Sequence, residues 1–133
     1  MGNLDVKYLF ESQCELIDNI KELLKVLDGK KYGKELERLY GIKVLTVQAD
    51  VNAGADNEAV VNNVVKQAMD TYGRIDVLIN NAQASASGVT LADHTTEQFD
   101  LAMYSGLYAA FYYMKACYPY LKETKGSVVN FAS

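Results

Sequence analysis

The order of apolar runs along the chain is the feature that most constrains its fold. Three short runs rich in β-branched residues have the composition of buried strands, namely "IKVLTVQAD" (42–50), "IDVLIN" (75–80) and "GSVVNFAS" (126–133). Between them the apolar residues recur at helical spacing, and no hairpin signal joins two runs. Strands that alternate with helices in this way form parallel βαβ units with right-handed crossovers. The sequence therefore predicts an α/β fold with three parallel strands and flanking helices.

Capping residues mark where the predicted helices begin and end. Thr95 and Gln98 have the spacing of a capping box, and Asp56 is placed to cap a helix that Gly73 closes. A further capping-box pattern begins an amphipathic N-terminal helix. The expected helices cover residues 12–27, 34–40, 57–72 and 97–122.

Length and charge bound the class of protein. A chain of 133 residues, 50% of them hydrophobic, fits one compact unit with one core. The net charge of -4 argues against nucleic acid as a partner, because Lys and Arg are not concentrated on any segment. No apolar run approaches the length of a bilayer span, and the first residues lack the pattern of a signal peptide. We therefore expect no membrane contact and a cytoplasmic location.

The cysteine and histidine content does not predict a metal site. Cys14 and Cys117 lie far apart on helical patterns without C-x-x-C spacing, so both are expected to be reduced thiols. His94 has no second His or Cys at ligand spacing and is expected in a loop.

Polar side chains stand at the ends of the predicted strands. Asp50 ends the first strand, Asn80 and Asn81 end the second, and Ser133 ends the third. The carboxyl ends of parallel strands meet at one edge of a sheet, where ligands bind. Asp50 can accept a hydrogen bond from a ligand or begin a turn, and the asparagine amides can knit strand ends together or form an Asx turn. Ser133 can donate to a substrate carbonyl or be a chain end. The residues alone leave these alternatives open.

Three motifs in the same order resemble the short-chain dehydrogenase/reductase family. They are "QADV", "GRIDVLINNAQ" and "GSVVNFAS". The family has in these places a strand ending in Asp-Val, a strand end reading Asn-Asn-Ala-Gly, and a strand of the form G-x-I/V-V-N-x-S-S. The resemblance covers residues 34–133 and implies a partial Rossmann-like three-layer fold, while residues 1–33 are expected to form an N-terminal amphipathic helix and loop without a family match. It also implies an oxidoreductase that moves hydride between NAD or NADP and a small alcohol or carbonyl substrate.

The resemblance implies roles for individual residues. Asp50 matches the residue whose carboxylate meets the adenine amino group of NAD(P), and Val51 matches one whose backbone supports the adenine ring. Asn80 matches an asparagine that steadies the central sheet, and Ala82 matches a residue beside the adenosine ribose. Ser133 matches the serine that binds the substrate carbonyl and is the candidate catalytic residue. The candidate cofactor-binding residues are Asp50, Val51, Asn80, Asn81, Ala82 and Gln83.

Two family motifs are missing from their usual places in this sequence. The T-G-x-x-x-G-x-G turn, which places backbone N–H groups on the pyrophosphate, has no counterpart. The sequence also stops at Ser133, ahead of the place of the family's Y-x-x-x-K pair, whose tyrosine is the acid and base. Tyr118 to Lys122 has the spacing Y-x-x-x-K, but it precedes the serine strand, so it is not expected to be the catalytic pair. We therefore expect a fragment of, or a protein related to, an NAD(P)-dependent oxidoreductase. As this chain it is expected to bind cofactor weakly or not at all and to be inactive.

Two positions inside the resemblance also depart from the family pattern. Gln83 stands where the family has glycine, a residue that lets the backbone approach a ligand closely. Its side chain either crowds the nicotinamide ribose or becomes a polar contact. Gly106 aligns, by its spacing from Phe99, with the family's catalytic asparagine. The proton relay that this asparagine supports is therefore not expected here in its usual form.

Loss of the family's first two strands changes the expected pairing of the sheet. We expect the strand at residues 42–50 to pair directly with that at 75–80, rather than to remain a poorly supported edge. The N-terminal helices are then expected to cover one face of the sheet.

Aromatic residues crowd the helix predicted at 97–122. They are enriched in interfaces, and the corresponding helix of the family forms part of a dimer interface, so a homo-oligomer through this helix is expected. The alternative is a helix packed on the sheet with tyrosine hydroxyls at its margin. A non-catalytic association module is therefore the alternative to an oxidoreductase. The aromatic residues are Tyr104, Tyr108, Phe111, Tyr112, Tyr113, Tyr118 and Tyr120.

Overall fold

The structure is a computed structural model that describes residues 29–51 and 56–131. The predicted helix at 12–27, Cys14 and Ser133 lie outside the described residues. In chain order the elements are α3 (Gly29–Tyr40), α4 (Asn57–Tyr72), β1 (Val77–Asn80), η2 (Leu91–Asp93), α5 (Thr96–Ala102), η3 (Met103–Tyr108), α6 (Ala109–Thr124) and β2 (Ser127–Asn130). The α/β prediction with parallel strands and flanking helices is confirmed.

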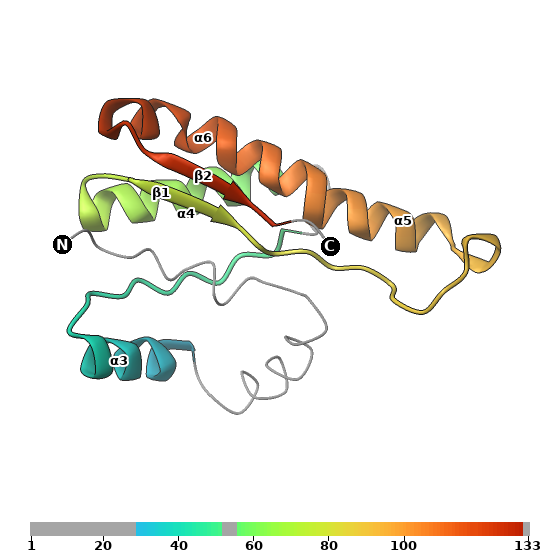
Figure 1. Cartoon of the computed structure of the whole chain (residues 1–133), viewed down its shortest axis with the longest axis horizontal. Helices are drawn as coiled ribbons and strands as arrows, with labels where there is room; N and C mark the ends of the chain where they lie inside the picture. The colour runs from blue at the N-terminus through green and yellow to red at the C-terminus, as the bar shows by residue number, and fades with distance from the viewer. Residues whose placement is uncertain (1–28, 52–55, 132–133) are drawn as a thin grey trace.

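Two parallel strands form the sheet of the described chain. β1 pairs with β2 in a register that sets Asn80 opposite Asn130. Figure 1 shows the strands side by side, with α6 running along them. The carboxyl ends of the two strands therefore lie at the same edge, as the sequence predicts.

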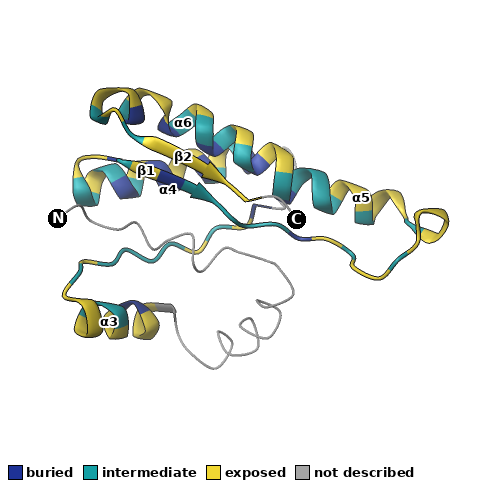
Figure 2. Cartoon of the chain, viewed as in Figure 1, coloured by how far each residue is buried: buried dark blue, intermediate teal, exposed yellow. Residues whose placement is uncertain are grey.

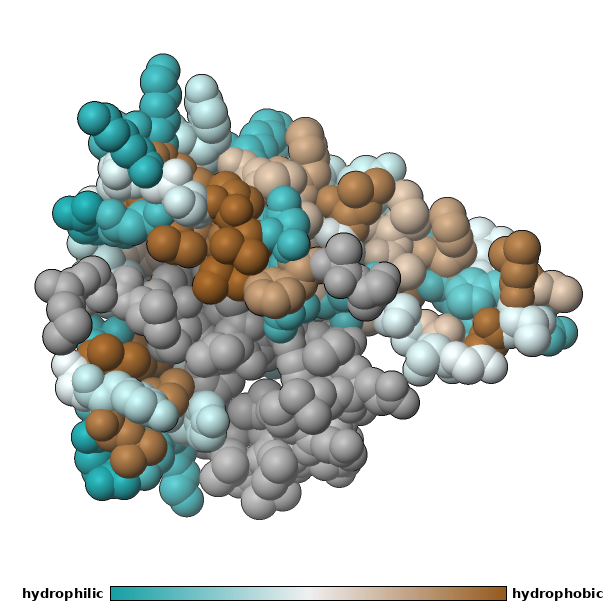
Figure 3. Space-filling model, viewed as in Figure 1, coloured by the Kyte–Doolittle hydropathy of each residue, from teal (hydrophilic) through white to brown (hydrophobic). Residues whose placement is uncertain are grey.

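The core lies where α4 and α6 pack against β1. Its most deeply buried members are Val61 and Val64 of α4, Leu78 of β1 and Cys117 of α6. Figure 2 shows the buried residues on the sides of these elements that face one another. The other surface of the strands is apolar but uncovered among the described residues, and it forms a brown patch over β1 and β2 in Figure 3.

The predicted strand at residues 42–50 is not formed. This segment is extended, but it joins no ladder among the described residues. Its backbone polar groups bind side chains instead, because the Val44 N–H donates to Glu37 Oε1 at 2.8 Å and the Tyr72 hydroxyl donates to the Lys43 carbonyl at 3.2 Å. The expected direct pairing with β1 is therefore wrong. The segment has the composition of a strand but no strand partner among the described residues.

The helix boundaries follow most of the predicted signals. The capping box of Thr95 and Gln98 is present with both reciprocal hydrogen bonds. Gly73 ends α4 with a φ of 72°, a conformation that suits glycine. Asp56 is the N-cap residue but makes no capping hydrogen bond with its side chain, so that detail of the prediction is wrong. α3 begins at Gly29, ahead of the predicted start at Lys34.

The long helix predicted at 97–122 is divided by a π-helical turn. α5 passes into η3, and η3 passes into α6, which continues to Thr124. π-helical turns widen a helix locally and occur frequently at functional sites. This turn contains Gly106, the position that aligns with the family asparagine.

Across the part of the chain that the structure describes, no helix combines the length and the apolar character that crossing a membrane requires.

Candidate active site

An amide pair joins the carboxyl ends of the two strands. The Asn80 Nδ2 atom donates to Asn130 Oδ1 at 2.8 Å, and the Phe131 N–H donates to the Asn80 carbonyl at 3.0 Å. The Asn130 Nδ2 atom in turn lies 3.7 Å from the Met114 sulfur on α6. Asn80 thus knits the strand ends together, which is the structural role that its amide suggested. Contact between Asn80 and a cofactor stays a prediction.

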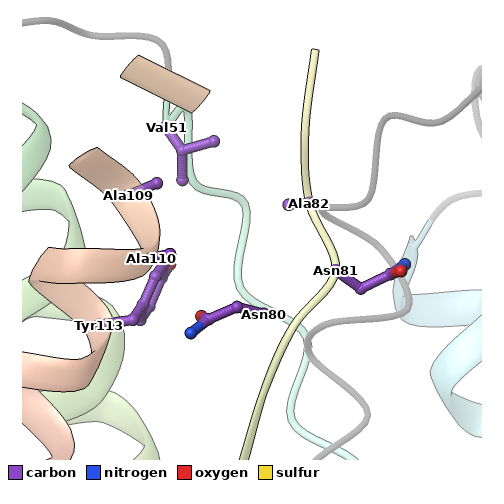
Figure 4. A pocket seen from close by; sticks show the side chains of 7 residues that line it. All are labelled: Val51, Asn80, Asn81, Ala82, Ala109, Ala110 and Tyr113. Atoms are coloured by element: carbon purple, nitrogen blue, oxygen red, sulfur yellow. The ribbon is translucent and has the colours of Figure 1, made fainter. Parts of the chain in front are cut away.

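The predicted residues at the end of β1 line a small cavity against α6. The cavity has a volume of about 10 Å³, which is close to the space that one water molecule needs. Figure 4 shows the Asn80 side chain pointing toward α6 and the Asn81 side chain pointing to the opposite side of the chain. The two neighbouring amides therefore face different environments, as alternating residues of an extended chain do. The lining residues are Val51, Asn80, Asn81, Ala82, Ala109, Ala110 and Tyr113.

A much larger groove opens beside this cavity, between the strand ends and the π-helical turn. Its volume is about 590 Å³, within the range of small-molecule sites. Most of its lining is apolar, and its hydrogen-bonding side chains are the amides of Asn80, Gln83 and Asn130. The apolar lining residues are Ala82, Ala102, Met103, Gly106, Leu107, Ala110, Phe111, Met114 and Phe131.

Asp50 and Val51 are adjacent in the sequence but differ in burial. Asp50 is exposed and lines neither the cavity nor the groove. Val51 is 3% exposed and lies in the core. The structure therefore brings Val51 into the same cavity as Asn80, whereas the Asp50 carboxylate remains at the surface.

Asn57 holds the segment that ends at Val51 against the π-helical turn, and the sequence analysis did not identify it. Its Nδ2 atom donates to the Val51 carbonyl at 2.6 Å and to the Tyr104 carbonyl at 3.2 Å. The side chain is fully buried, and its Oδ1 atom has no hydrogen-bond partner among the described residues. The sequence feature that could have identified Asn57 is an amide side chain in the first turn of a helix that follows a strand-like run.

Ser105 was also missed, and it holds the loop after β1. Its Oγ atom accepts a hydrogen bond from the Ala84 N–H at 2.7 Å. The same oxygen lies 3.1 Å from the Ala84 carbonyl and 2.7 Å from the Leu101 carbonyl, either of which can accept its proton. Ser105 is fully buried, so these contacts are shielded from water. The loop that carries Gln83 is thereby fixed to the helix that carries Gly106.

Gln83 lies over Gly106 in the wall of the groove. A Cβ atom placed on Gly106 would lie 3.4 Å from Gln83 Cγ and 3.6 Å from both Cδ and Nε2. The two departures from the family pattern are therefore neighbours in space. Gln83 was expected either to crowd the nicotinamide ribose or to become a polar contact. Its place in the groove wall fits the polar contact.

The ionisable groups whose pKa values are shifted lie away from the groove. Two hydrogen bonds from the Arg74 guanidinium hold the pKa of the Asp76 carboxyl below its ordinary value. A hydrogen bond to Glu58 raises the pKa of Lys115. None of these residues lines the groove, whose described lining contains no ionisable side chain. That part of the groove can hydrogen-bond a ligand but supplies no general acid or base.

No group of three His, Cys, Asp or Glu side chains that could hold a metal ion occurs within residues 29–51 and 56–131. His94 lies in a loop, as predicted.

Comparison with known proteins decides the ancestry of this site. The family described as short chain dehydrogenase matches residues 15–133. The chain belongs to the short-chain dehydrogenase family. The family match begins before Lys34, where the resemblance was expected to begin, and it includes the strand ends and the π-helical turn.

Individual relatives of this short-chain dehydrogenase agree with that assignment. The chain is 61% identical over 109 residues to a 12α-hydroxysteroid dehydrogenase from a Clostridium species, covering 82% of this chain and 41% of that protein. It is 40% identical over 97 residues to a 2-(R)-hydroxypropyl-CoM dehydrogenase of Xanthobacter autotrophicus, covering 71% of this chain and 37% of the relative. The chain thus spans less than half the length of these curated relatives.

Solved structures share the fold. An alcohol dehydrogenase of the archaeon Thermococcus sibiricus, complexed with 5-hydroxy-NADP, has a TM-score of 0.67 at 24% identity and matches 74% of this chain over 40% of its own. An NADPH-dependent 3-quinuclidinone reductase of Rhodotorula rubra has a TM-score of 0.70 at 23% identity and matches 80% of this chain over 39% of its own. The present chain therefore has part of the fold of these structures, over about 40% of each.

Proposed function

We propose that this chain forms the strand-edge part of the active site of an NAD(P)-dependent oxidoreductase. The reaction transfers hydride between the nicotinamide cofactor and an alcohol or carbonyl substrate. The chain by itself is proposed to be inactive, because the sequence has no glycine-rich turn and its Tyr-x-x-x-Lys spacing, from Tyr118 to Lys122, lies ahead of the serine strand. A cytoplasmic location belongs to the same proposal.

The observation that carries this proposal is the groove at the carboxyl ends of β1 and β2. Its apolar wall comes from η3 and α6, and its amides come from the strand ends. Ligands of parallel α/β sheets bind at this edge. A mostly apolar site with a few polar groups suits a mostly apolar molecule that carries a hydroxyl or carbonyl group.

The cofactor is proposed to lie along the same edge. In this proposal the end of β1, with Asn80, Asn81 and Ala82, borders the cofactor ribose, and Asp50 with Val51 borders the adenine. Residues 29–51 and 56–131 contain no glycine-rich phosphate turn, so affinity for NADH or NADPH is expected to be weak. Submillimolar binding in a cofactor-fluorescence titration would contradict this expectation.

The proposed substrate class is a hydroxysteroid or an apolar alcohol of similar size. The 61% identical relative is a 12α-hydroxysteroid dehydrogenase, and its resemblance covers 82% of this chain. Deoxycholate, which carries a 12α-hydroxyl group, is therefore a suitable probe for the groove.

Titration of the chain with deoxycholate below its micelle concentration tests the proposed site. Amide NMR signals of groove residues should shift, and Leu107→Ser should weaken binding several-fold because it removes apolar surface from the groove wall. Leu91→Ser is the matched control, since Leu91 is 94% exposed and does not line the groove. Equal effects of the two substitutions, or no binding, would contradict the proposed site.

A second candidate function is association through the aromatic helix. Leu107, Tyr108, Phe111 and Tyr118 expose large apolar side chains on η3 and α6. Tyr108 also stacks between Tyr104 and Tyr112, with ring centroids 5.1 and 6.3 Å apart. Exposed aromatic surface of this kind suits an interface with a second copy of the chain.

A further inference from the structure

Gln83 occupies the space that a side chain at position 106 would otherwise fill. A Cβ atom on Gly106 would already be in van der Waals contact with the Gln83 side chain, at 3.4 Å from Cγ. A longer side chain at 106 would therefore have to displace Gln83. Position 106 has no side chain where the family has asparagine, and position 83 has a long side chain where the family has glycine.

The backbone on both sides of this contact is anchored. The residue after Gln83 is Ala84, and the residue before Gly106 is Ser105. The Ala84 N–H donates to Ser105 Oγ at 2.7 Å, and that oxygen lies 3.1 Å from the Ala84 carbonyl. This buried clamp fixes where the Gln83 side chain leaves the loop, and so directs it over the π-helical turn.

The three amides of the groove differ in what they already bind. Asn80 and Asn130 are joined to each other at 2.8 Å, and Asn130 also contacts the Met114 sulfur at 3.7 Å. No hydrogen bond within residues 29–51 and 56–131 uses the Gln83 carboxamide. Its donor and its acceptor are therefore available to a ligand in the groove.

We propose that Gln83 is a specificity-determining residue, which hydrogen-bonds the hydroxyl or carbonyl oxygen of an apolar substrate in the groove. The inference rests on the proposed function. A carboxamide can accept from an alcohol and donate to a ketone, so one side chain serves both the reduced and the oxidised substrate. A small residue at position 106 is required for this arrangement because it leaves room for Gln83.

The test compares two steroids on the 133-residue chain. Deoxycholate carries a 12-hydroxyl group that lithocholate lacks, so the ratio of their affinities isolates the contribution of that group. The chain should prefer deoxycholate by roughly three- to tenfold, the usual value of one net hydrogen bond. Deoxycholate should also shift the side-chain NH₂ signal of Gln83 in a ¹⁵N-resolved spectrum.

Three variants test whether Gln83 causes the preference. Gln83→Leu keeps side-chain bulk without the amide and should bring the affinity ratio close to one, with lithocholate binding changed by less than about twofold. Gly106→Leu should also remove the preference by displacing Gln83, whereas Gly106→Ala should retain it, because its Cβ would lie 3.4 Å from Gln83 Cγ. Thermal unfolding of each variant verifies that it is folded.

The outcomes separate this inference from the proposed function. If the chain binds both steroids but Gln83→Leu leaves the ratio unchanged, the role of Gln83 is wrong and the groove remains a steroid site. Equal binding of both steroids by the unaltered chain would likewise contradict the role of Gln83 and leave the groove as a steroid site. If the chain binds neither steroid, the proposed substrate class fails, and the role of Gln83 fails with it.

Discussion

At the scale of single residues, Asn57 connects two parts of the site that lie far apart in sequence. It donates to the carbonyl of Val51, which lines the small cavity, and to the carbonyl of Tyr104, which belongs to the π-helical turn. Both acceptors are backbone carbonyls, and that of Tyr104 also accepts from the Ala109 N–H. The side chain therefore sets the distance between the proposed adenine edge and the groove wall.

Replacement of Asn57 by alanine should lower the free energy of unfolding by about 1–3 kcal/mol, the cost of leaving buried polar groups unsatisfied. Urea unfolding measures this difference. Asn62→Ala is the matched control, because Asn62 is exposed on the same helix and should change stability by less than about 0.5 kcal/mol. Similar losses for the two variants would show that Asn57 is not a structural link.

The residues of the candidate site were predictable to different degrees. Asn80 ends an apolar run, and the rule that ligands gather at strand ends was enough to single it out, whereas Ala82 and Gln83 were implied by the family resemblance. Asn57 donates to a backbone carbonyl and Ser105 accepts from a backbone N–H of another segment, and only the folded chain brings these groups within reach. Residues of this second kind carry no local pattern that distinguishes them from ordinary helix residues.

At the scale of elements, the turn from α6 into β2 depends on a glycine for space rather than for backbone conformation. A Cβ atom on Gly126 would lie 2.3 Å from the Asp76 carbonyl oxygen and 2.7 Å from Leu121 Cδ2. The same carbonyl accepts a hydrogen bond from the Ser127 N–H at 2.9 Å, which begins the pairing of the strands. Any side chain at 126 must therefore separate β2 from β1 or from α6.

Gly126→Ala should destabilise the chain by about 1–3 kcal/mol, the usual cost of overpacking a closed contact. Gly106→Ala should have the opposite sign and stabilise by about 0.5–1 kcal/mol, because alanine replaces glycine inside a helix with room for the methyl group. Thermal or urea unfolding of both variants measures whether the free energy of unfolding falls for Gly126→Ala and rises for Gly106→Ala. A neutral Gly126→Ala would mean that the two strands are not held this closely.

The elements also show which parts of the fold the sequence could specify. The capping box of Thr95 and Gln98 and the closing Gly73 act locally, so their patterns identified the helix ends correctly. A strand requires a partner for its backbone groups. Residues 42–50 have the composition of a strand, but the Val44 N–H donates to Glu37 and the segment pairs with no strand of the part of the chain that the structure describes. Composition alone could not reveal the missing neighbour.

At the scale of the whole molecule, the exposed aromatic surface of η3 and α6 predicts self-association. Tyr118→Lys should lower the average mass at high protein concentration, because a charged side chain would enter the interface. Tyr40→Lys on α3 is the matched control, since Tyr40 is 68% exposed and Tyr118 is 64% exposed. Light scattering measures the mass. A strictly monomeric unaltered chain would contradict the proposed interface.

The whole chain is proposed to form part of a short-chain dehydrogenase active site. The relative that is 61% identical over 109 residues supplies the direct test, because this chain covers 41% of it. The matched segment of the 12α-hydroxysteroid dehydrogenase is replaced by the matched segment of this chain, and NAD(P)-dependent oxidation of deoxycholate is followed by cofactor absorbance. The account predicts that the chimera oxidises deoxycholate at a rate within about tenfold of the parent enzyme. A chimera that folds with the thermal stability of the parent but does not oxidise deoxycholate would contradict it.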